Sequence, residues 1–202
     1  MEFGEVVRRR RMVRAFADRP VPRAVIDGVL DAALRAPSAG FSQGWAFLVL
    51  EGPAQTALFW ELTAPLGAAG GTRWDRLRRA PVLVLPLAHR QAYLDRYGEP
   101  DKISRGLDTA EAWRVPYWLV DTSFATMTML LAATDARLGA LFFGLGGGER
   151  ALLDRLGVPP GYEPIGAVAL GWPGEGDAPS PSLARGRRPR RETVHYGRWE
   201  GT

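Results

Sequence analysis

The chain has 202 residues and a net charge of +4, and 46% of its residues are hydrophobic, which suits a globular domain with a substantial core rather than a disordered chain. It contains no cysteine and two histidines, His89 and His195. Disulfides, thiolate nucleophiles and cysteine-ligated metals are therefore excluded, and a multi-histidine metal site is nearly excluded. Any redox chemistry must come from a bound cofactor.

Arginine dominates the basic residues, since Lys102 is the only lysine. Its planar guanidinium suits phosphate, but Ala, Gly and Pro are also abundant, as in GC-rich coding sequences. We therefore interpret most arginines as a compositional bias and give weight only to those at particular places. Near the N-terminus, charged residues stand where a signal peptide would have an apolar run. The longest weakly charged stretch, 115–134, contains Pro116 and Asp121, which favours a buried helix over a membrane span. We expect a cytoplasmic protein with no membrane span.

Periodicity and end signals give the expected elements in chain order. Helices are predicted over 2–11, 22–36, 52–62, a short stretch ending at 79, 117–137 and 149–156. Strands are predicted over 45–50, 81–87, 139–144 and 166–172, with Pro86 placing the end of its strand at an edge or bend. Residues 64–71 suggest a loop of small residues, and 89–116 an irregular excursion or lid. One domain with an extended C-terminal arm from 173 to 202 is the simplest organisation.

Two segments carry candidate chemistry. In the first, residues 8–16 (RRRRMVRAF), several guanidinium groups converge where a helix ends, as a phosphate site requires. A solvated helix end and a nucleic-acid patch are the competing interpretations. In the second, residues 36–45 (APSAGFSQGW), small residues between a helix and a strand let backbone amides approach a flat ring. An ordinary connecting loop is the alternative there.

Together these segments resemble the nitroreductase family, in which "RR-x-x-R-x-F" precedes "APSA-x-x-Q-x-W" at the start of a strand. Residues 118–140 (WLVDTSFATMTMLLAATDARLGA) look like that family's long central helix and following strand, and 185–189 (RGRRP) like its closing basic segment. The resemblance implies an α+β nitroreductase-like fold with a central, mostly antiparallel mixed sheet flanked by helices. It also implies a homodimer with shared active sites, onto whose partner subunit the arm docks.

The resemblance also implies roles for single residues. Arg10 and Arg14 match positions that hold the phosphate and the pyrimidine edge of FMN, and backbone contacts are expected from Arg11 and Met12 between them. Arg185 and Arg187, in the arm, match two further positions that complete the phosphate site. A loop from the partner subunit packs on the isoalloxazine ring, and the end of the third strand lies beside its N5. The implied cofactor-binding residues are Arg10, Arg11, Met12, Arg14, Pro37, Ser38, Ala39, Gly40, Gln43, Phe143, Gly144, Leu145, Arg185 and Arg187.

The chain departs from the family pattern at the ring end. Phe41 stands where members often have an asparagine that contacts the flavin, and Gly44 replaces a proline, which leaves the loop freer. A glutamate often found near Phe143 is absent. The substrate pocket is expected to be lined by aromatic residues, namely Phe41, Trp113, Tyr117 and Trp118, although core packing is an equally good explanation for most of them.

The implied activity is an FMN-dependent oxidoreductase, with no side chain acting as catalyst and no metal. It would pass hydride from NAD(P)H, or a deazaflavin, through flavin N5 to a small acceptor such as a nitroaromatic or a quinone. The main alternative is an FMN-binding protein that stores, senses or processes flavin without turning over an external substrate. A basic nucleic-acid-binding domain is a third hypothesis, disfavoured because the arginines are local rather than spread over a face.

Overall fold

A five-stranded sheet forms the centre of the computed structural model, which describes residues 1–63 and 72–199. The strand order is β1-β2-β5-β3, with the short β4 also paired to β2, and all these pairs are antiparallel. The strands are β1 (Trp45–Glu51), β2 (Val82–His89), β3 (Gly139–Phe143), β4 (Tyr162–Pro164) and β5 (Ala167–Gly171). The expected α+β class with a mostly antiparallel sheet is confirmed.

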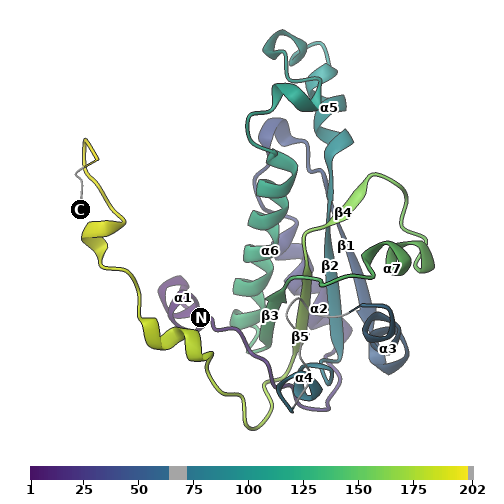
Figure 1. The fold of residues 1–202 in the computed structure, drawn as a ribbon, viewed down its shortest axis with the longest axis vertical. Helices are drawn as coiled ribbons and strands as arrows, with labels where there is room; N and C mark the ends of the chain where they lie inside the picture. Colours follow the sequence, from purple (N-terminus) through teal and green to yellow (C-terminus); the bar gives the residue numbers. More distant parts are fainter. Residues whose placement is uncertain (64–71, 200–202) are drawn as a thin grey trace.

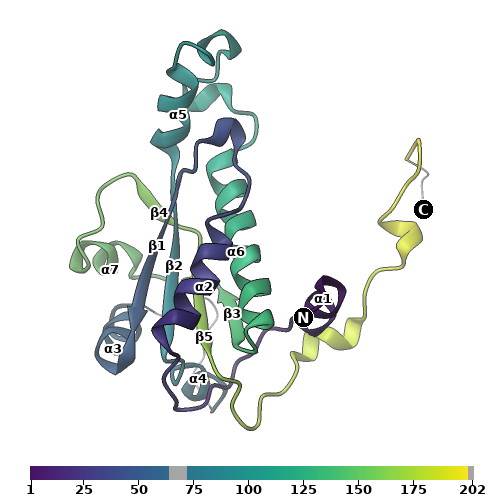
Figure 2. The same cartoon turned by 180° about the vertical axis from the view of Figure 1, so that it is seen from behind.

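Helices cover both faces of the sheet, as Figures 1 and 2 show. One face carries α2 and the long α6, and the other carries α3, α4 and α7. The α-helices are α1 (Phe3–Arg9), α2 (Arg23–Ala33), α3 (Gly52–Leu62), α4 (Thr72–Leu77), α5 (Arg90–Gly98), α6 (Tyr117–Asp135) and α7 (Glu149–Arg155). The short 3-10 helices are η1 (Ala39–Phe41), η2 (Ile103–Arg105), η3 (Ala110–Ala112), η4 (Pro181–Arg185) and η5 (Arg190–Glu192).

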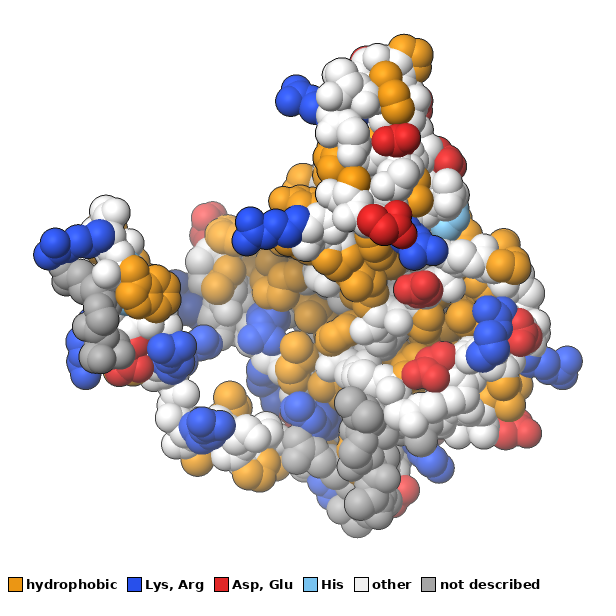
Figure 3. Space-filling view, turned by 45° about the horizontal axis from the view of Figure 1, so that its top comes forward, with side chains coloured by type: hydrophobic (Ala, Val, Ile, Leu, Met, Phe, Trp, Pro, Cys, Tyr) orange, Lys and Arg blue, Asp and Glu red, His pale blue; other side chains and the backbone are white. Residues whose placement is uncertain are grey.

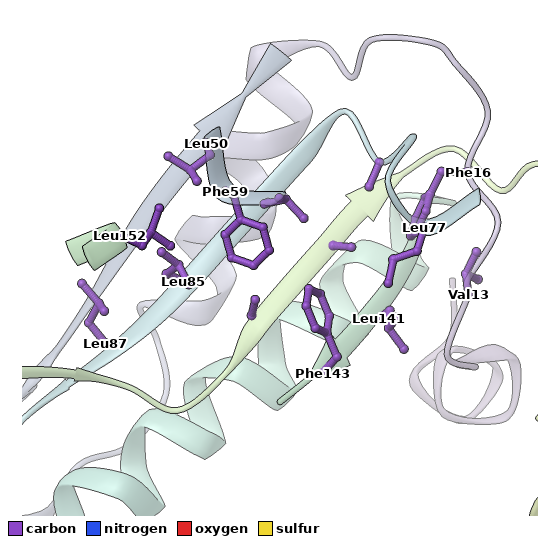
Figure 4. Close-up of a cluster of buried hydrophobic side chains, with 14 of the residues drawn as sticks. Val13, Phe16, Leu50, Phe59, Leu77, Leu85, Leu87, Leu141, Phe143 and Leu152 are labelled. Carbon is purple, nitrogen blue, oxygen red and sulfur yellow. The ribbon is translucent and has the colours of Figure 1, made fainter. Parts of the chain in front are cut away.

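The two-residue period of the strands divides the core between these faces. On β2, Leu83, Leu85 and Leu87 point towards α3 and α7, while Val82 and Val84 point towards α2 and α6. Figure 4 shows the first cluster, in which side chains from β2 and β3 meet Phe59 of α3. Because both faces are covered, β1, β2, β3 and β5 are apolar over most of their length, which made them recognisable in the sequence.

The expectation for Pro86 was wrong, because β2 continues past it to His89 in the middle of the sheet. The carbonyl of Pro86 accepts a hydrogen bond from the amide of Ile165 (3.1 Å), on the side away from β1. On that side the partner strand changes from β5, opposite Val84, to β4, opposite Leu87. The missing proline N–H therefore falls in the gap between two partners, where it interrupts no ladder.

The excursion between β2 and α6 contains a helix that the sequence did not predict, since α5 occupies its first third. With η2 and η3, it projects beyond the end of the sheet at the top of Figure 1. The strand β4 was also missed, while the predicted loop at 64–71 lies outside the described residues. The arm leaves the body after Trp172 and runs away from the sheet (Figures 1 and 2).

Within the described parts of the chain, no helix has both the length and the apolar character needed to cross a membrane.

Candidate functional site

The arginine segment that follows α1 lies along the first residues of β3. Met12 forms a parallel bridge with Ala140, and the amide of Val13 donates to the carbonyl of Ala140 at 2.9 Å. The close approach requires Gly139, since a Cβ there would lie 2.8 Å from Val13 Cγ1. Arg10 and Arg14, both half-buried, therefore flank a short stretch of backbone whose position is fixed by the sheet.

An acidic residue of the arm, Asp177, is bound to this segment. Its carboxylate accepts hydrogen bonds from the amides of Arg14 (2.7 Å) and Ala15 (3.1 Å) and pairs with the Arg11 guanidinium. The side chain of Asp177 is 3% exposed, so three donors surround a nearly buried anion. Sequence analysis missed this residue, because nothing in its local sequence sets it apart from the other acidic residues of the arm. The contact commits Arg11 to the arm within its own chain.

The other predicted phosphate residues are not brought together in one chain. Arg185 ends η4 and Arg187 follows it, and both are exposed on the arm. Among the described residues, neither of them nor Arg10 takes part in an ion pair with a carboxylate, whereas Arg14 donates to the carbonyl of Met12 (3.0 Å). Within the part of the chain that the structure describes, three arginines of the predicted set thus pair with no carboxylate.

The loop predicted to pack on the flavin ring has an unusual backbone. Gly40, Phe41 and Gln43 all have positive φ, at 61°, 57° and 48°, although such values are uncommon for residues other than glycine. Within the loop, Ser38 Oγ accepts from the amide of Gln43 (3.0 Å) and Ser42 Oγ donates to the carbonyl of Ala39 (2.7 Å). Pro37 and Gln43 are exposed, and Phe41 is 74% exposed.

The expectation that Gly44 leaves this loop freer was wrong. A Cβ at Gly44 would lie 2.4 Å from Tyr93 Cε2 and 2.8 Å from the carbonyl oxygen of His89. The carbonyl of Gly44 also accepts from the amide of His89 at 2.8 Å. Glycine is needed at this position because α5 packs directly on the backbone, so the loop is held more firmly rather than less.

Two residues outside the loop complete its support. Asp121, in α6, accepts hydrogen bonds at the same oxygen from the amide of Ala39 (2.8 Å) and the hydroxyl of Tyr93 (2.9 Å). Burial and the neighbouring carboxylate raise the pKa of Tyr93 well above its ordinary value, so the hydroxyl remains a donor. Arg96 Nε donates to the carbonyl of Gly40 at 2.9 Å.

The predicted pocket aromatics form a cluster beside this loop. Trp113 contacts the rings of Tyr93, Tyr97, Tyr117 and Trp118, with centroid distances from 4.8 to 6.2 Å. Its indole N–H donates to the carbonyl of Leu107 (2.7 Å). Trp113 and Trp118 are half-buried, whereas Tyr117 and Phe41 are exposed, so the latter two are the members that a substrate can reach from outside this chain.

At the end of β3, the side chain of Phe143 points into the core. It stacks on Trp60 with a centroid distance of 5.8 Å and meets Phe59 edge-on at 6.1 Å. Figure 4 shows Phe143 beside Phe59 in this cluster. Only the backbone of Phe143 is thus available to face a ring. Gly144 and Leu145, which follow, are half-buried.

The arginine segment and the ring-facing loop lie at opposite ends of α6. Asp121 near the start of α6 holds Ala39, while Asp135 at its end accepts from the amino group of Met1, which begins the segment leading through α1 to Arg10. The 14 residues from Asp121 to Asp135 span about 21 Å of helix. A cavity of about 860 Å³ between α3 and the start of β2 includes none of the predicted site residues. One chain therefore holds the predicted site residues in two separate groups, here named half-sites.

Comparison with known proteins agrees with this fold. The model of the nitroreductase family matches residues 7–172. A Thermus thermophilus NADH dehydrogenase is 29% identical over 87% of this chain and 88% of its own length, and a Bacillus subtilis FMN reductase [NAD(P)H] is 26% identical over 86% and 66%. A Desulfovibrio desulfuricans protein crystallised with FMN superposes with a TM-score of 0.68 at 22% identity over 99% of both chains.

The family match covers most of the chain, including the arginine segment, the ring-facing loop, α6 and the whole sheet. The chain belongs to the nitroreductase family, a family of oxidoreductases.

Proposed function

We propose that this protein is an FMN-dependent oxidoreductase that takes reducing equivalents from NAD(P)H and delivers them to a small organic acceptor. The observation that carries the proposal is the arginine segment fixed along β3, in a chain of this family. Support comes from the B. subtilis relative named FMN reductase and from the D. desulfuricans neighbour bound to FMN. When bound, FMN supplies the hydride chemistry, and the protein supplies binding and orientation.

The residues of this chain fit such a cofactor. Arg10, Arg14, Arg185 and Arg187 are donors of the kind that bind phosphate through paired N–H groups. The adjoining backbone amides at Arg14 and Ala15 already hold the carboxylate of Asp177, so this corner of the fold favours anions. A charge-assisted hydrogen bond contributes about 1.5–3 kcal/mol, so each guanidinium is expected to strengthen binding roughly 10- to 100-fold.

We further propose that the working unit is a homodimer, since only a second copy can bring an arginine segment next to a ring-facing loop. An apolar stripe along α6 supports this arrangement. Its members recur at helical spacing and include exposed Tyr117, Phe124 and Met127, together with half-buried Val120 and Leu131. Figure 3 shows hydrophobic side chains gathered on the body below the projecting segment.

In this dimer the residues of the chain bind and orient rather than exchange protons. Arg10 and the arm arginines hold the phosphate, and Arg14 supports negative charge at the pyrimidine edge of the ring. The ring-facing loop would pack on the ring held in the partner's site, with the exposed Phe41 beside it. A reduced nicotinamide and the acceptor would bind next to Phe41 in turn.

The test is the absorption spectrum of the purified protein with added FMN, followed by steady-state NADH and NADPH oxidation with nitroaromatic and quinone acceptors. We expect bound flavin, turnover with at least one pair, and loss of flavin binding in Arg14→Ala. A protein that takes up no FMN contradicts the proposal. FMN binding without turnover favours a flavin-storing, flavin-sensing or flavin-processing protein instead.

A further inference from the structure

The backbone of the ring-facing loop is held from two sides. On one side, the amide of Ala39 donates to Asp121 Oδ2 at 2.8 Å, and on the other, the carbonyl of Gly40 accepts from Arg96 Nε at 2.9 Å. Asp121 is 2% exposed and belongs to α6, whereas Arg96 belongs to α5. Two consecutive residues are thus fixed by groups from two different helices.

The residue directly after this pair is Phe41, whose positive φ of 57° a phenylalanine rarely adopts. Phe41 is 74% exposed in the single chain, so packing within its own chain does not stabilise that conformation. Gly40 is confined as well, because a Cβ there would lie 2.8 Å from Tyr97 Cε2. An unfavourable backbone that persists without burial requires restraint by its surroundings, and such positions concentrate at functional sites.

Asp121 receives a second hydrogen bond, from the hydroxyl of Tyr93, on the same oxygen that accepts from Ala39. An oxygen with two lone pairs can accept both, and the amide oxygen of asparagine has the same capacity. Alanine at this position leaves the amide of Ala39 without its partner. The site therefore offers a conservative substitution and a disruptive one at a single residue.

We propose that Asp121 is a positioning residue which, together with Arg96, holds Ala39 and Gly40 so that Phe41 projects towards the partner's site and limits which acceptors enter it. This inference rests on the proposed function, because it assigns the loop to a flavin site. Asp121 touches neither flavin nor acceptor and acts through Phe41. The phosphate end of the same chain lies at the other end of α6, so it is expected to be insensitive to Asp121.

The experiment uses the FMN-loaded protein and compares Asp121→Ala, Asp121→Asn, Arg96→Gln and Phe41→Ala, with kcat and KM measured for a small and a bulky acceptor. Phe41→Ala is expected to change the ratio of the two kcat/KM values about tenfold. Asp121→Ala should reproduce that change, and Asp121→Asn should stay within about twofold of the parent. The FMN dissociation constant is measured for each variant, so that the kinetic constants are compared at saturating FMN.

The double variant Asp121→Ala with Phe41→Ala separates positioning from a general structural effect. If Asp121 acts through Phe41, the double variant is no worse than Phe41→Ala alone. Losses that multiply, or an unchanged acceptor ratio in Asp121→Ala, overturn the inference. If Asp121→Ala fails to fold, Arg96→Gln replaces it in the double-mutant cycle with Phe41→Ala, because Arg96 is partly exposed. The same two outcomes then support or overturn the inference.

Amide hydrogen exchange across residues 38–44 provides a readout that needs no flavin. Exchange in Asp121→Ala is expected to be at least about tenfold faster than in the parent and in Asp121→Asn. Equal exchange in all three overturns the proposed restraint, even if the protein binds no FMN. A colourless parent protein contradicts only the proposed function, so the two failures are distinguishable.

Discussion

The carboxylate of Asp177 accepts a hydrogen bond of 2.7 Å from the amide of Arg14, a residue 163 positions earlier in the chain. The same carboxylate binds the amide of Ala15 and the side chain of Arg11. Asp177 thereby adds to the contacts that attach the arm to this segment, among them the hydrogen bond from the amide of Gly174 to the carbonyl of Ala15 (2.8 Å).

Replacing Asp177 with alanine is expected to lower the free energy of unfolding by about 1–3 kcal/mol, because two backbone amides lose their partner in a nearly buried place. Thermal unfolding of the variant measures the change. Glu175→Ala, at an exposed position two residues earlier, is the matched control and should be nearly neutral. Equal melting temperatures for the two variants would contradict the role given to Asp177.

Gly44→Ala should be strongly destabilising. Its Cβ would meet Tyr93 at 2.4 Å and the His89 carbonyl at 2.8 Å, so backbone must shift, at a cost of about 1–3 kcal/mol or more. Gly28→Ala in α2 is the control, since its Cβ meets nothing within 4 Å, and it should stabilise the helix by about 0.5–1 kcal/mol. Chemical denaturation of both variants checks the opposite signs.

On the arm, Arg187→Ala is expected to weaken FMN binding roughly 10- to 100-fold, as the loss of one charge-assisted contact to phosphate predicts. Arg191→Ala removes the same charge from an exposed position four residues later and controls for net charge. Flavin titrations followed by absorbance measure both dissociation constants. Similar small losses in the two variants would mean that the arm acts only through its overall charge.

Phe124→Glu places a charge in the apolar stripe of α6, where Phe124 is 49% exposed in the single chain. We expect the variant to be monomeric by sedimentation, because burying an unpaired carboxylate at an interface is unfavourable. Leu34→Glu, at the C-cap of α2, changes a similarly exposed apolar residue outside the stripe and should leave the dimer intact. A parent protein that sediments as a monomer rules out the shared site altogether.

Alkaline pH should destabilise the protein through Tyr93. Its pKa is raised in the folded state, mainly by burial, so the unfolded chain loses this proton first as the pH rises through about 10. Stability is therefore fully present below that pH and declines above it. Melting temperatures between pH 8 and 11 should fall more steeply for the parent than for Tyr93→Phe, and parallel curves would exclude a contribution from this hydroxyl.

Much of the fold was predictable because its signals are local. The apolar runs of β1, β2, β3 and β5 and the ends of α3 and α6 follow from residue pattern and from Gly and Pro positions. The helix α5 was not predictable in this way, because its one fully buried side chain, Tyr93, is placed by contacts with Asp121 and Gly44. Similarly, β4 has three residues and exists through its pairing with β2.

In the candidate site, too, the residues in local motifs were predictable and those placed by long-range contacts were not. The arginine segment and the small-residue loop were visible as motifs, and the roles of their residues came from family resemblance. Asp177 and Asp121 were not assigned to the site, since each acts through backbone amides at least 82 residues away in sequence. Long-range contacts of single acids leave no periodic trace.

The two half-sites at opposite ends of α6 have a genetic consequence. In the proposed dimer, each site combines the arginine end of one chain with the loop end of the other. A chain defective in Arg14 and a chain defective in the loop therefore form, when co-expressed, a mixed dimer with one doubly defective site and one intact site. Two inactive alleles would complement each other, because the mixed dimer, with one intact site, would have up to half of the activity of the parent dimer.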